Sequence, residues 1–309
     1  MRVFDLHCDT LTAPAPFAGH VTLEQGKALD AWAQVFAIFV PDTLRGQAAA
    51  EHLGRALAFY ETRRAELESV CRPLLALENG SALCGDLDNL DLLAARRVRI
   101  VTLTWNGENE LGYGARCDPR LDLKPFGKQA VERMFALGIF PDVSHLNPAG
   151  FWDVMEIAAG RPVLATHSNC AAVRPHCRNL DDGQLQALFA CGGLVGLNLY
   201  TQFLGGAGAA EDVARHLAHL CALGGEAHAA LGSDFDGCEV HPSLAGMGRL
   251  EALDSALERL GFTSRQRAAF FWENAERVIE RPPPKGREAL DRPRFYGCGV
   301  GCGVTMGGG

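Results

Sequence analysis

The chain opens with a short strand-like stretch that runs directly into donor groups, Arg2-Val3-Phe4-Asp5-Leu6-His7-Cys8-Asp9. Its first five residues have the largely apolar character of a buried strand. In an extended strand, residues two apart face the same side, so His7 and Asp9 can act together while Cys8 points away. Several later strand-like stretches of the chain also end in polar donors.

Seven further strand-like stretches follow, separated by helix-patterned segments. The expected strands are residues 2–6, 32–40, 72–77, 98–104, 139–143, 162–166, 193–199 and 229–232. The expected helices are residues 47–68, 87–96, 126–137, 149–159, 182–191, 211–223, 250–260 and 264–280. This alternation predicts parallel strands with right-handed crossovers, and eight units favour a closed (β/α)8 barrel of the TIM type. No GxGxxG follows the first strand and no GxxxxGK[ST] occurs, which disfavours a nucleotide-binding sheet.

The composition of the chain favours a globular protein over a disordered, nucleic-acid-binding or membrane protein. Of the 309 residues, 48% are apolar and 21% are charged, which supports a large core and is untypical of a disordered chain. The formal net charge is −8 and Lys and Arg do not cluster, so neither nucleic acid nor an anionic membrane is an expected partner. The N-terminus lacks the apolar segment of a secretory signal, and no apolar run approaches the ~20 residues of a membrane span. A cytoplasmic protein with reduced cysteines is therefore expected.

The chain divides into two parts by composition. The barrel is expected to span residues 1–281. Pro282-Pro283-Pro284 then excludes a helix, and the last residues are rich in glycine, with Cys298 and Cys302 among them. Residues 282–309 are therefore predicted to form a poorly ordered C-terminal tail.

Donor side chains gather at the ends of the predicted strands, where TIM-type barrels carry their active sites. Five strands are followed by the donors His7, Asp9, Glu78, His145, His167 and Asp234. Buried imidazoles and carboxylates brought together would repel or lie unsatisfied unless a cation sat among them. Nitrogen and oxygen donors suit Zn²⁺, and Mn²⁺ or Co²⁺ can substitute. Six donors exceed one tetrahedral ion, so the pattern predicts two ions sharing a carboxylate and a hydrolytic water.

Seven short motifs occur in a fixed order along the chain and together identify a family. They are Asp5-Leu6-His7-Cys8-Asp9-Thr10, Ala76-Leu77-Glu78-Asn79-Gly80, Val101-Thr102-Leu103-Thr104, Asp142-Val143-Ser144-His145, Thr166-His167-Ser168-Asn169, Arg178-Asn179-Leu180-Asp181-Asp182 and Gly232-Ser233-Asp234-Phe235-Asp236-Gly237. In this order, from residue 5 to about residue 279, the chain resembles the membrane (renal-type) dipeptidases, peptidase family M19, among the amidohydrolase-like metal barrels. The resemblance implies a dizinc dipeptidase that hydrolyses L,L dipeptides, with L,D dipeptides as a further class.

The resemblance also implies a role for each metal donor. His7 and Asp9 look like ligands of the first zinc, and His145 and His167 look like ligands of the second. Glu78 resembles the carboxylate that bridges the two ions.

Further residues are implied to act on the substrate. Asp234 resembles the acidic residue that handles protons beside the first zinc, so Asp234 and Glu78 are the expected catalytic residues. Arg178 matches the clamp for the substrate carboxylate, a role that suits a bidentate guanidinium. Tyr200 is expected to line the pocket. Trp105 stands where the mammalian renal enzyme has a histidine that stabilises the tetrahedral oxygen, and neighbouring Asn106 or a loop donor such as Asn109 is expected to compensate.

Two alternatives to a dipeptidase stay open on the sequence. One is another hydrolase on the same binuclear metal barrel, such as an amidase, deacetylase or lactonase. The other is a weakly active relative that binds peptides, for which Trp105 is the only sequence support. The resemblance also leaves a homodimer open, because family members are often dimers.

Overall fold

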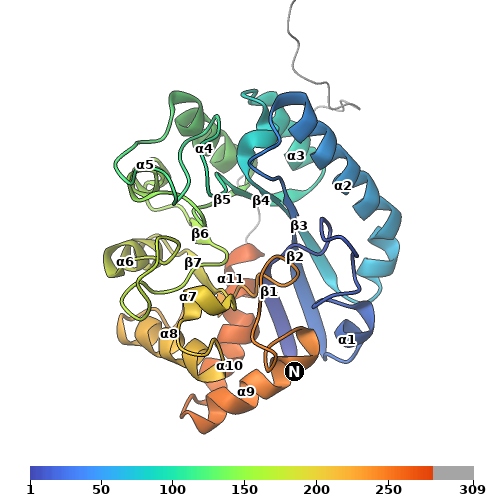
Figure 1. Ribbon diagram of the computed structural model, residues 1–309, viewed down its shortest axis with the longest axis vertical. Helices are drawn as coiled ribbons and strands as arrows, with labels where there is room; N and C mark the ends of the chain where they lie inside the picture. The colour runs from blue at the N-terminus through green and yellow to red at the C-terminus, as the bar shows by residue number, and fades with distance from the viewer. Residues whose placement is uncertain (281–309) are drawn as a thin grey trace, which may run out of the picture.

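The eight predicted strands pair in chain order and close on themselves. A computed structural model describes residues 1–280, and Figure 1 shows its strands as a ring inside a layer of helices. All neighbouring strands are parallel, and β1 closes the ring on β8 through Asp5 and Leu231. The (β/α)8 fold predicted from the sequence is therefore confirmed. The strands are β1 Arg2–Cys8, β2 Ala31–Phe39, β3 Arg72–Glu78, β4 Val98–Thr102, β5 Phe140–Asp142, β6 Leu164–Ala165, β7 Leu194–Leu197 and β8 Ala229–Leu231.

The helices follow the predicted pattern, with additions. The longer ones are α2 Gly46–Glu68, α3 Asp88–Ala95, α4 Pro125–Leu137, α5 Pro148–Ala158, α6 Asp182–Ala190, α8 Ala210–Ala222 and α9 Leu250–Arg259. The sequence did not predict the shorter α1 Leu23–Lys27, α7 Thr201–Leu204, η1 Gly80–Leu83 and η2 Met247–Arg249. The helix expected at residues 264–280 consists of α10 Ser264–Ala268, the π-helical segment η3 Ala269–Glu273 and α11 Asn274–Ile279. The wider π-helical turn lets the consecutive residues Phe270, Phe271 and Trp272 all be buried.

Strands β5 and β6 each end one residue earlier than expected, where a side chain takes over the backbone hydrogen bonding. Oδ1 of Asp142 accepts from the backbone N–H groups of Ser144 at 3.0 Å and Thr166 at 2.9 Å. These N–H groups bond to the carboxylate and make no ladder hydrogen bond. The chain therefore leaves the sheet after Asp142 and Ala165, just before the predicted histidines.

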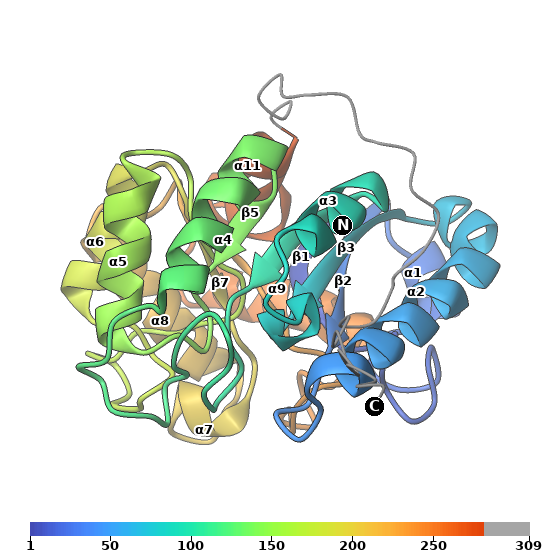
Figure 2. The ribbon, with the colours of Figure 1, turned by 90° about the horizontal axis from the view of Figure 1, so that it is seen from above.

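The barrel interior has a closed end and an open end. Its core contains inward-facing strand residues such as Phe4, Leu6 and Ile100, together with Trp272 and Ile279 from the C-terminal helical segments. The rings of Phe4 and Trp272 lie 5.8 Å apart. Figure 2 shows α11 and α7 at opposite ends of the barrel. Since α11 covers the end where the strands begin, the open pocket over the strand ends lies at the end where they finish.

Two further expectations from the sequence concern the C-terminal tail and membrane-spanning helices. The tail predicted at residues 282–309 lies outside the described residues. Among residues 1–280, the helices are all too short or too polar to cross a bilayer.

Candidate active site

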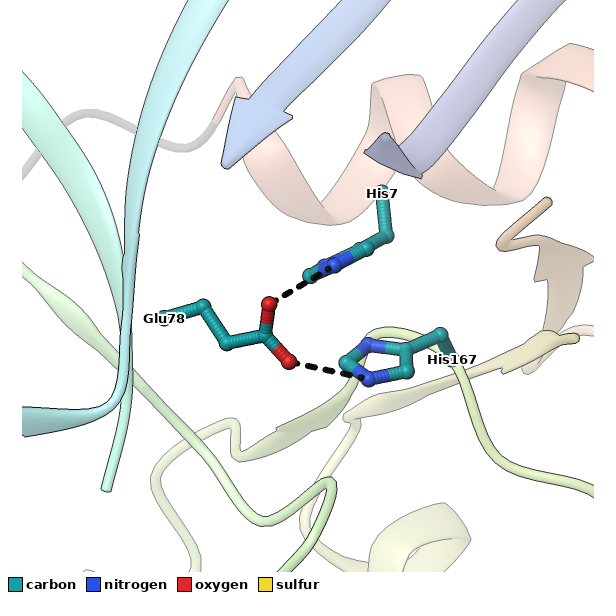
Figure 3. Close-up of side chains that lie close together, drawn as sticks. All are labelled: His7, Glu78 and His167. Carbon is teal, nitrogen blue, oxygen red and sulfur yellow. Dashed lines mark ion pairs between the residues drawn. The ribbon is translucent and has the colours of Figure 1, made fainter. Parts of the chain in front are cut away.

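The predicted metal donors surround the carboxylate of Glu78, the last residue of β3. Its Oε1 lies 3.1 Å from Nε2 of His145 and 3.6 Å from Nε2 of His167. Its Oε2 lies 3.5 Å from Nε2 of His7. Figure 3 shows the carboxylate facing the rings of His7 and His167, with one oxygen toward each, and the centroids of the two rings lie 3.8 Å apart. Glu78 is therefore placed where a carboxylate shared by two ions would have to be.

A second group of donors meets at the junction of β1 and β8. Nε2 of His7 lies 3.8 Å from Oδ2 of Asp9 and 3.9 Å from Oδ1 of Asp234. As the two-residue spacing predicts, His7 and Asp9 face the same space. Cys8 points the other way, into the core between strands and helices. The six donors expected from the sequence thus lie in one cluster.

Burial controls the charge of this cluster. It raises the pKa of Asp9 to about 6 and the pKa of Asp234 to about 6, and nearby carboxylates add to both shifts. Burial lowers the pKa of His145 and His167 well below the usual range, and neighbouring cationic groups add to these shifts. Burial opposes a charged His7 as well, but the carboxylates of Glu78 and Asp9 outweigh it and raise the pKa of His7.

These residues fit a divalent cation. Nε2 of His7, Nε2 of His167 and Oδ1 of Asp9 are buried without a hydrogen-bond partner. Such orphaned donor atoms are costly unless a bound group satisfies them. Two overlapping groups have ligand atoms within 4.8 Å of one another: His7, Glu78 and His167, and His7, Asp9 and Asp234. Imidazole and carboxylate donors in this number match zinc and related ions.

Two of the donors sit on strained backbone. His145 has φ 68° and Asp234 has φ 61°, in the left-handed region that costs an ordinary residue roughly 1–2 kcal/mol. The backbone carbonyl of His145 accepts from the N–H of Ala115 at 2.7 Å, and the N–H of Asp234 donates to the carbonyl of His7 at 3.1 Å. These bonds hold both side chains toward the cluster, as is common at functional sites.

A pocket of about 790 Å³ lies over the cluster, and Arg178 forms part of its wall. Arg178 is only 4% exposed. Its Nη2 donates to the carbonyl of His167 at 3.3 Å, its Nε has no partner, and within residues 1–280 it forms no ion pair. Burial lowers its pKa to about 10, so the guanidinium stays charged near neutral pH. The wall of the pocket therefore contains a buried, charged guanidinium with N–H groups available to a ligand.

The other predicted substrate-binding residues also line this pocket. Trp105 packs edge-on against Phe39, with ring centroids 5.1 Å apart, and its ring lies 6.1 Å from that of His145. Tyr200 packs edge-on against Phe203 at 4.7 Å. Asn106 has a second contact that the sequence did not predict, because its Oδ1 lies 3.1 Å from Nδ1 of His145.

Sequence reasoning missed the residues that hold the donors in place. Asp5 accepts from the backbone N–H of His7 at 3.3 Å and from the N–H and hydroxyl of Ser233 at 2.8 and 2.6 Å. Asn198 donates to Oδ2 of Asp234 at 2.8 Å. The hydroxyl of Thr166 contacts the rings of His7 and His167. Asp5 and Thr166 belong to the quoted motifs. Their positions next to His7 and His167 in the sequence could have indicated that they hold these donors.

A closed α/β barrel with imidazole and carboxylate donors gathered at one rim defines the class of metal-dependent barrel hydrolases. The family that matches residues 46–282 is membrane dipeptidase, peptidase family M19. The match covers more than half of the chain, which therefore belongs to this family of metallopeptidases. The resemblance read from the seven motifs is confirmed.

Relatives and solved structures agree with this assignment. An uncharacterized protein in the pqqA 5′ region of Klebsiella pneumoniae is 31% identical over 244 residues, 75% of this chain and 90% of that protein. The crystal structure of dipeptidase AC, a family M19 metallopeptidase, has 29% identity and a TM-score of 0.79, covering 91% of this chain and 98% of that one. A Rhodobacter sphaeroides metallopeptidase bound to a phosphinate mimic of L-Ala-D-Ala has 28% identity and a TM-score of 0.80, covering 91% and 99%.

Proposed function

We propose that the protein is a dipeptidase that hydrolyses short dipeptides at a pair of divalent cations, Zn²⁺ in the first place. The observation that carries this proposal is the cluster of six nitrogen and oxygen donors beneath a pocket lined by Arg178, which is buried and forms no ion pair within residues 1–280. The cluster is suited to hydrolysis, and the guanidinium to a substrate with a free carboxylate.

The donors divide between the two metal positions as the family resemblance implies. His7 and Asp9 would hold the first ion, His145 and His167 the second, and Glu78 both. Mn²⁺ or Co²⁺ would be accepted in place of Zn²⁺, because the donor set carries no thiolate that selects softer metals. When bound, paired ions of this kind lower the pKa of a water between them and polarise the carbonyl of the substrate.

Asp234 would act as the general base and then as the general acid. Its pKa of about 6 lets it accept a proton from the attacking water near neutral pH and return it to the departing amine. Asn198 holds Oδ2 of Asp234 at 2.8 Å, which leaves Oδ1 directed toward His7. The carboxylate therefore has one oxygen fixed by the protein and one facing the reaction.

Arg178 would limit the substrate to dipeptides. A guanidinium grips a carboxylate through two parallel hydrogen bonds, and burial strengthens such a pair. Because Arg178 lies in the wall of the pocket over the donors, the residue it holds is the one directly after the scissile bond. The volume of about 790 Å³ is in the usual range for a small-molecule site.

Trp105, Asn106 and Tyr200 would complete the substrate pocket. Trp105 and Tyr200 supply aromatic walls, while Asn106 orients His145 and contacts the substrate. The Rhodobacter sphaeroides structure holds an L-Ala-D-Ala mimic, which supports L,D as well as L,L dipeptides as substrates. The homodimer and the cytoplasmic location expected from the sequence stay predictions.

The direct test is hydrolysis of a panel of L,L and L,D dipeptides by the purified protein with Zn²⁺, with a chelator, and as the Asp234→Asn variant. We expect turnover that chelator and substitution both abolish. Turnover of dipeptides that survives chelation would overturn the metal mechanism. Hydrolysis of amides, acetylated amines or lactones without any dipeptide turnover would favour the alternative barrel hydrolases. Two bound ions with no hydrolysis of any of these would favour a binding protein.

A further inference from the structure

The hydroxyl of Thr166, just after β6, is the meeting point of four side chains, of which Ser144 is the most distant, with its Oγ 3.5 Å from Oγ1 of Thr166. This Oγ1 lies 2.7 Å from Oδ2 of Asp142, 2.8 Å from Nδ1 of His167 and 3.4 Å from Nδ1 of His7. Thr166 is fully buried, as are both histidines. Under the metal assignment proposed above, these two rings belong to different ions.

The direction of each hydrogen bond follows from the capacity of the hydroxyl. Asp142 is surrounded by donors, because Oδ1 accepts from the N–H groups of Ser144 and Thr166, and Oδ2 lies 2.6 Å from the hydroxyl of Thr102. A carboxylate in this setting only accepts. The single hydrogen of Thr166 therefore goes to Asp142, and its lone pairs face the ring nitrogens at 2.8 and 3.4 Å, with the hydroxyl of Ser144 a longer contact at 3.5 Å.

Once a cation has displaced the second proton of His7, both imidazoles must then carry their hydrogen on Nδ1. This leaves Nε2 of His7 and Nε2 of His167 as bare acceptors, and both are buried nitrogens without a hydrogen-bond partner among residues 1–280. Each bare nitrogen faces the carboxylate of Glu78, at 3.5 and 3.6 Å. One hydroxyl thus selects the metal-binding tautomer of two rings and limits their rotation.

We propose that Thr166, oriented by Asp142, is a positioning residue that links the two metal positions. The inference rests on the proposed function, because it assigns His7 and His167 to different ions. His145 stands outside the link, since Asn106 holds its Nδ1 separately at 3.1 Å. Losing the hydroxyl of Thr166 should therefore weaken both positions together, whereas losing Asn106 should weaken only the position that contains His145.

The test compares Thr166→Val, which keeps the shape of the side chain, with Thr166→Ser, which keeps the hydroxyl. Zn²⁺ is titrated into the chelator-treated full chain against a competing chromophoric chelator, and two dissociation constants are fitted. We expect Thr166→Val to raise both by about 10–100-fold, the usual effect of removing a partner of a metal ligand. Thr166→Ser should stay within about threefold of the wild type. Ser168→Ala is the matched control, because its buried hydroxyl has no partner.

Histidine nitrogen NMR shifts give a second readout that a general loss of packing would not imitate. In the zinc-loaded wild type, His7 and His167 should show protonated Nδ1, and in Thr166→Val a mixture of tautomers should appear. Two tightly bound ions in both the wild type and Thr166→Val, with unchanged tautomers, would overturn the role of Thr166 but leave the proposed function intact. Weakening of one ion only would overturn the link between positions. A wild type that binds no ion pair would instead overturn the proposed function. If Thr166→Val fails to fold, the tautomers of the wild type and the zinc affinity of Thr166→Ser still test the role of Thr166.

Discussion

Nε2 of His145 lies 3.1 Å from Oε1 of Glu78, while Oε2 of the same carboxylate faces His7. One side chain thus spans the space between the two groups of donors. Under the proposed assignment both oxygens would bind metal, so neither position would be complete without Glu78.

Replacing Glu78 with Gln should therefore remove most of the bound metal and most of the activity. A neutral amide loses the charge that both ions need, so we expect kcat/KM to fall about 1,000-fold or more, in line with several kcal/mol of lost metal stabilisation. Metal content per chain and dipeptide turnover are the measurements. Glu108→Gln, the same change at an exposed residue paired with Lys124, is the control and should behave as wild type. Full zinc content in Glu78→Gln would contradict a bridging role.

Arg178 should be needed only for substrates that end in a free carboxylate. Arg178→Met should lower kcat/KM for dipeptides about 100-fold or more, because loss of one partner of a buried charge pair costs 2–5 kcal/mol or above. Dipeptide amides, which have no carboxylate, should be poor substrates of wild type and variant alike. Arg178→Lys keeps the charge but loses the two-point grip, and should recover only part of the rate. Equal losses on dipeptides and their amides would show that Arg178 acts on structure rather than on the carboxylate.

Zinc affinity should rise with pH through about 6. Without a cation, Asp9 and Asp234 have pKa values raised to about 6 by burial, so below that pH both carry protons that a metal must displace. The raised pKa of His7 extends this competition above pH 6.5, whereas His145 and His167 are already neutral. Apparent affinity should change by about tenfold per pH unit for each competing proton.

The control for this pH dependence is Asp234→Asn, which removes one of the competing protons. Its slope of affinity against pH below 6 should be shallower by one proton than that of the wild type. Dissociation constants measured from pH 5 to pH 8 in a non-coordinating buffer provide the comparison. Affinity that does not vary over this range would contradict competition between protons and metal at this cluster.

Gly237 should tolerate no side chain. A Cβ at this position would collide with Oδ2 of Asp9 and would stand 2.9 Å from Oδ1 of Asp234. Gly237→Ala should therefore displace two acidic groups of the cluster and lower metal affinity at least tenfold, a weakening of roughly 1.4 kcal/mol. Gly54→Ala in α2 is the control, because its Cβ meets nothing within 4 Å and alanine favours a helix. The melting temperature should rise in the control, and zinc affinity should fall only in Gly237→Ala.

Trp105 should influence which N-terminal residue the enzyme prefers. Arg178 comes from the loop after β6, and Trp105 and Phe39 come from the other side of the pocket, after β4 and at the end of β2. With the carboxylate of the substrate on Arg178, the N-terminal side chain extends toward this aromatic pair. Trp105→Ala should reduce kcat/KM about tenfold for N-terminal Leu or Phe, and much less for Gly, because apolar contact is lost. Trp105→Phe should restore the preference for N-terminal Leu or Phe. An equal reduction of kcat/KM for every dipeptide in Trp105→Ala would contradict a role of Trp105 in this preference.

The sequence by itself determined the fold class and the donor set. Eight alternations of strand and helix admit few arrangements other than a parallel barrel, and the polar residues after the strands must then meet at one rim. For that reason His7, Asp9, Glu78, His145, His167 and Asp234 could be named before any distance was known. The two-residue spacing of His7 and Asp9 also determined which way Cys8 points, since side chains alternate along a strand.

Only the tertiary structure decided how these donors are held. In the part of the chain that the structure describes, Arg178 is buried without an acidic partner, and this depends on every residue packed around it, which no local pattern encodes. The same is true of Asn106, whose amide oxygen contacts His145, and of Thr166, whose hydroxyl contacts rings from β1 and from its own loop. Periodicity records which face of an element is apolar. A hydrogen bond between segments more than a hundred residues apart depends on positions within a few tenths of an ångström, and those are set by packing.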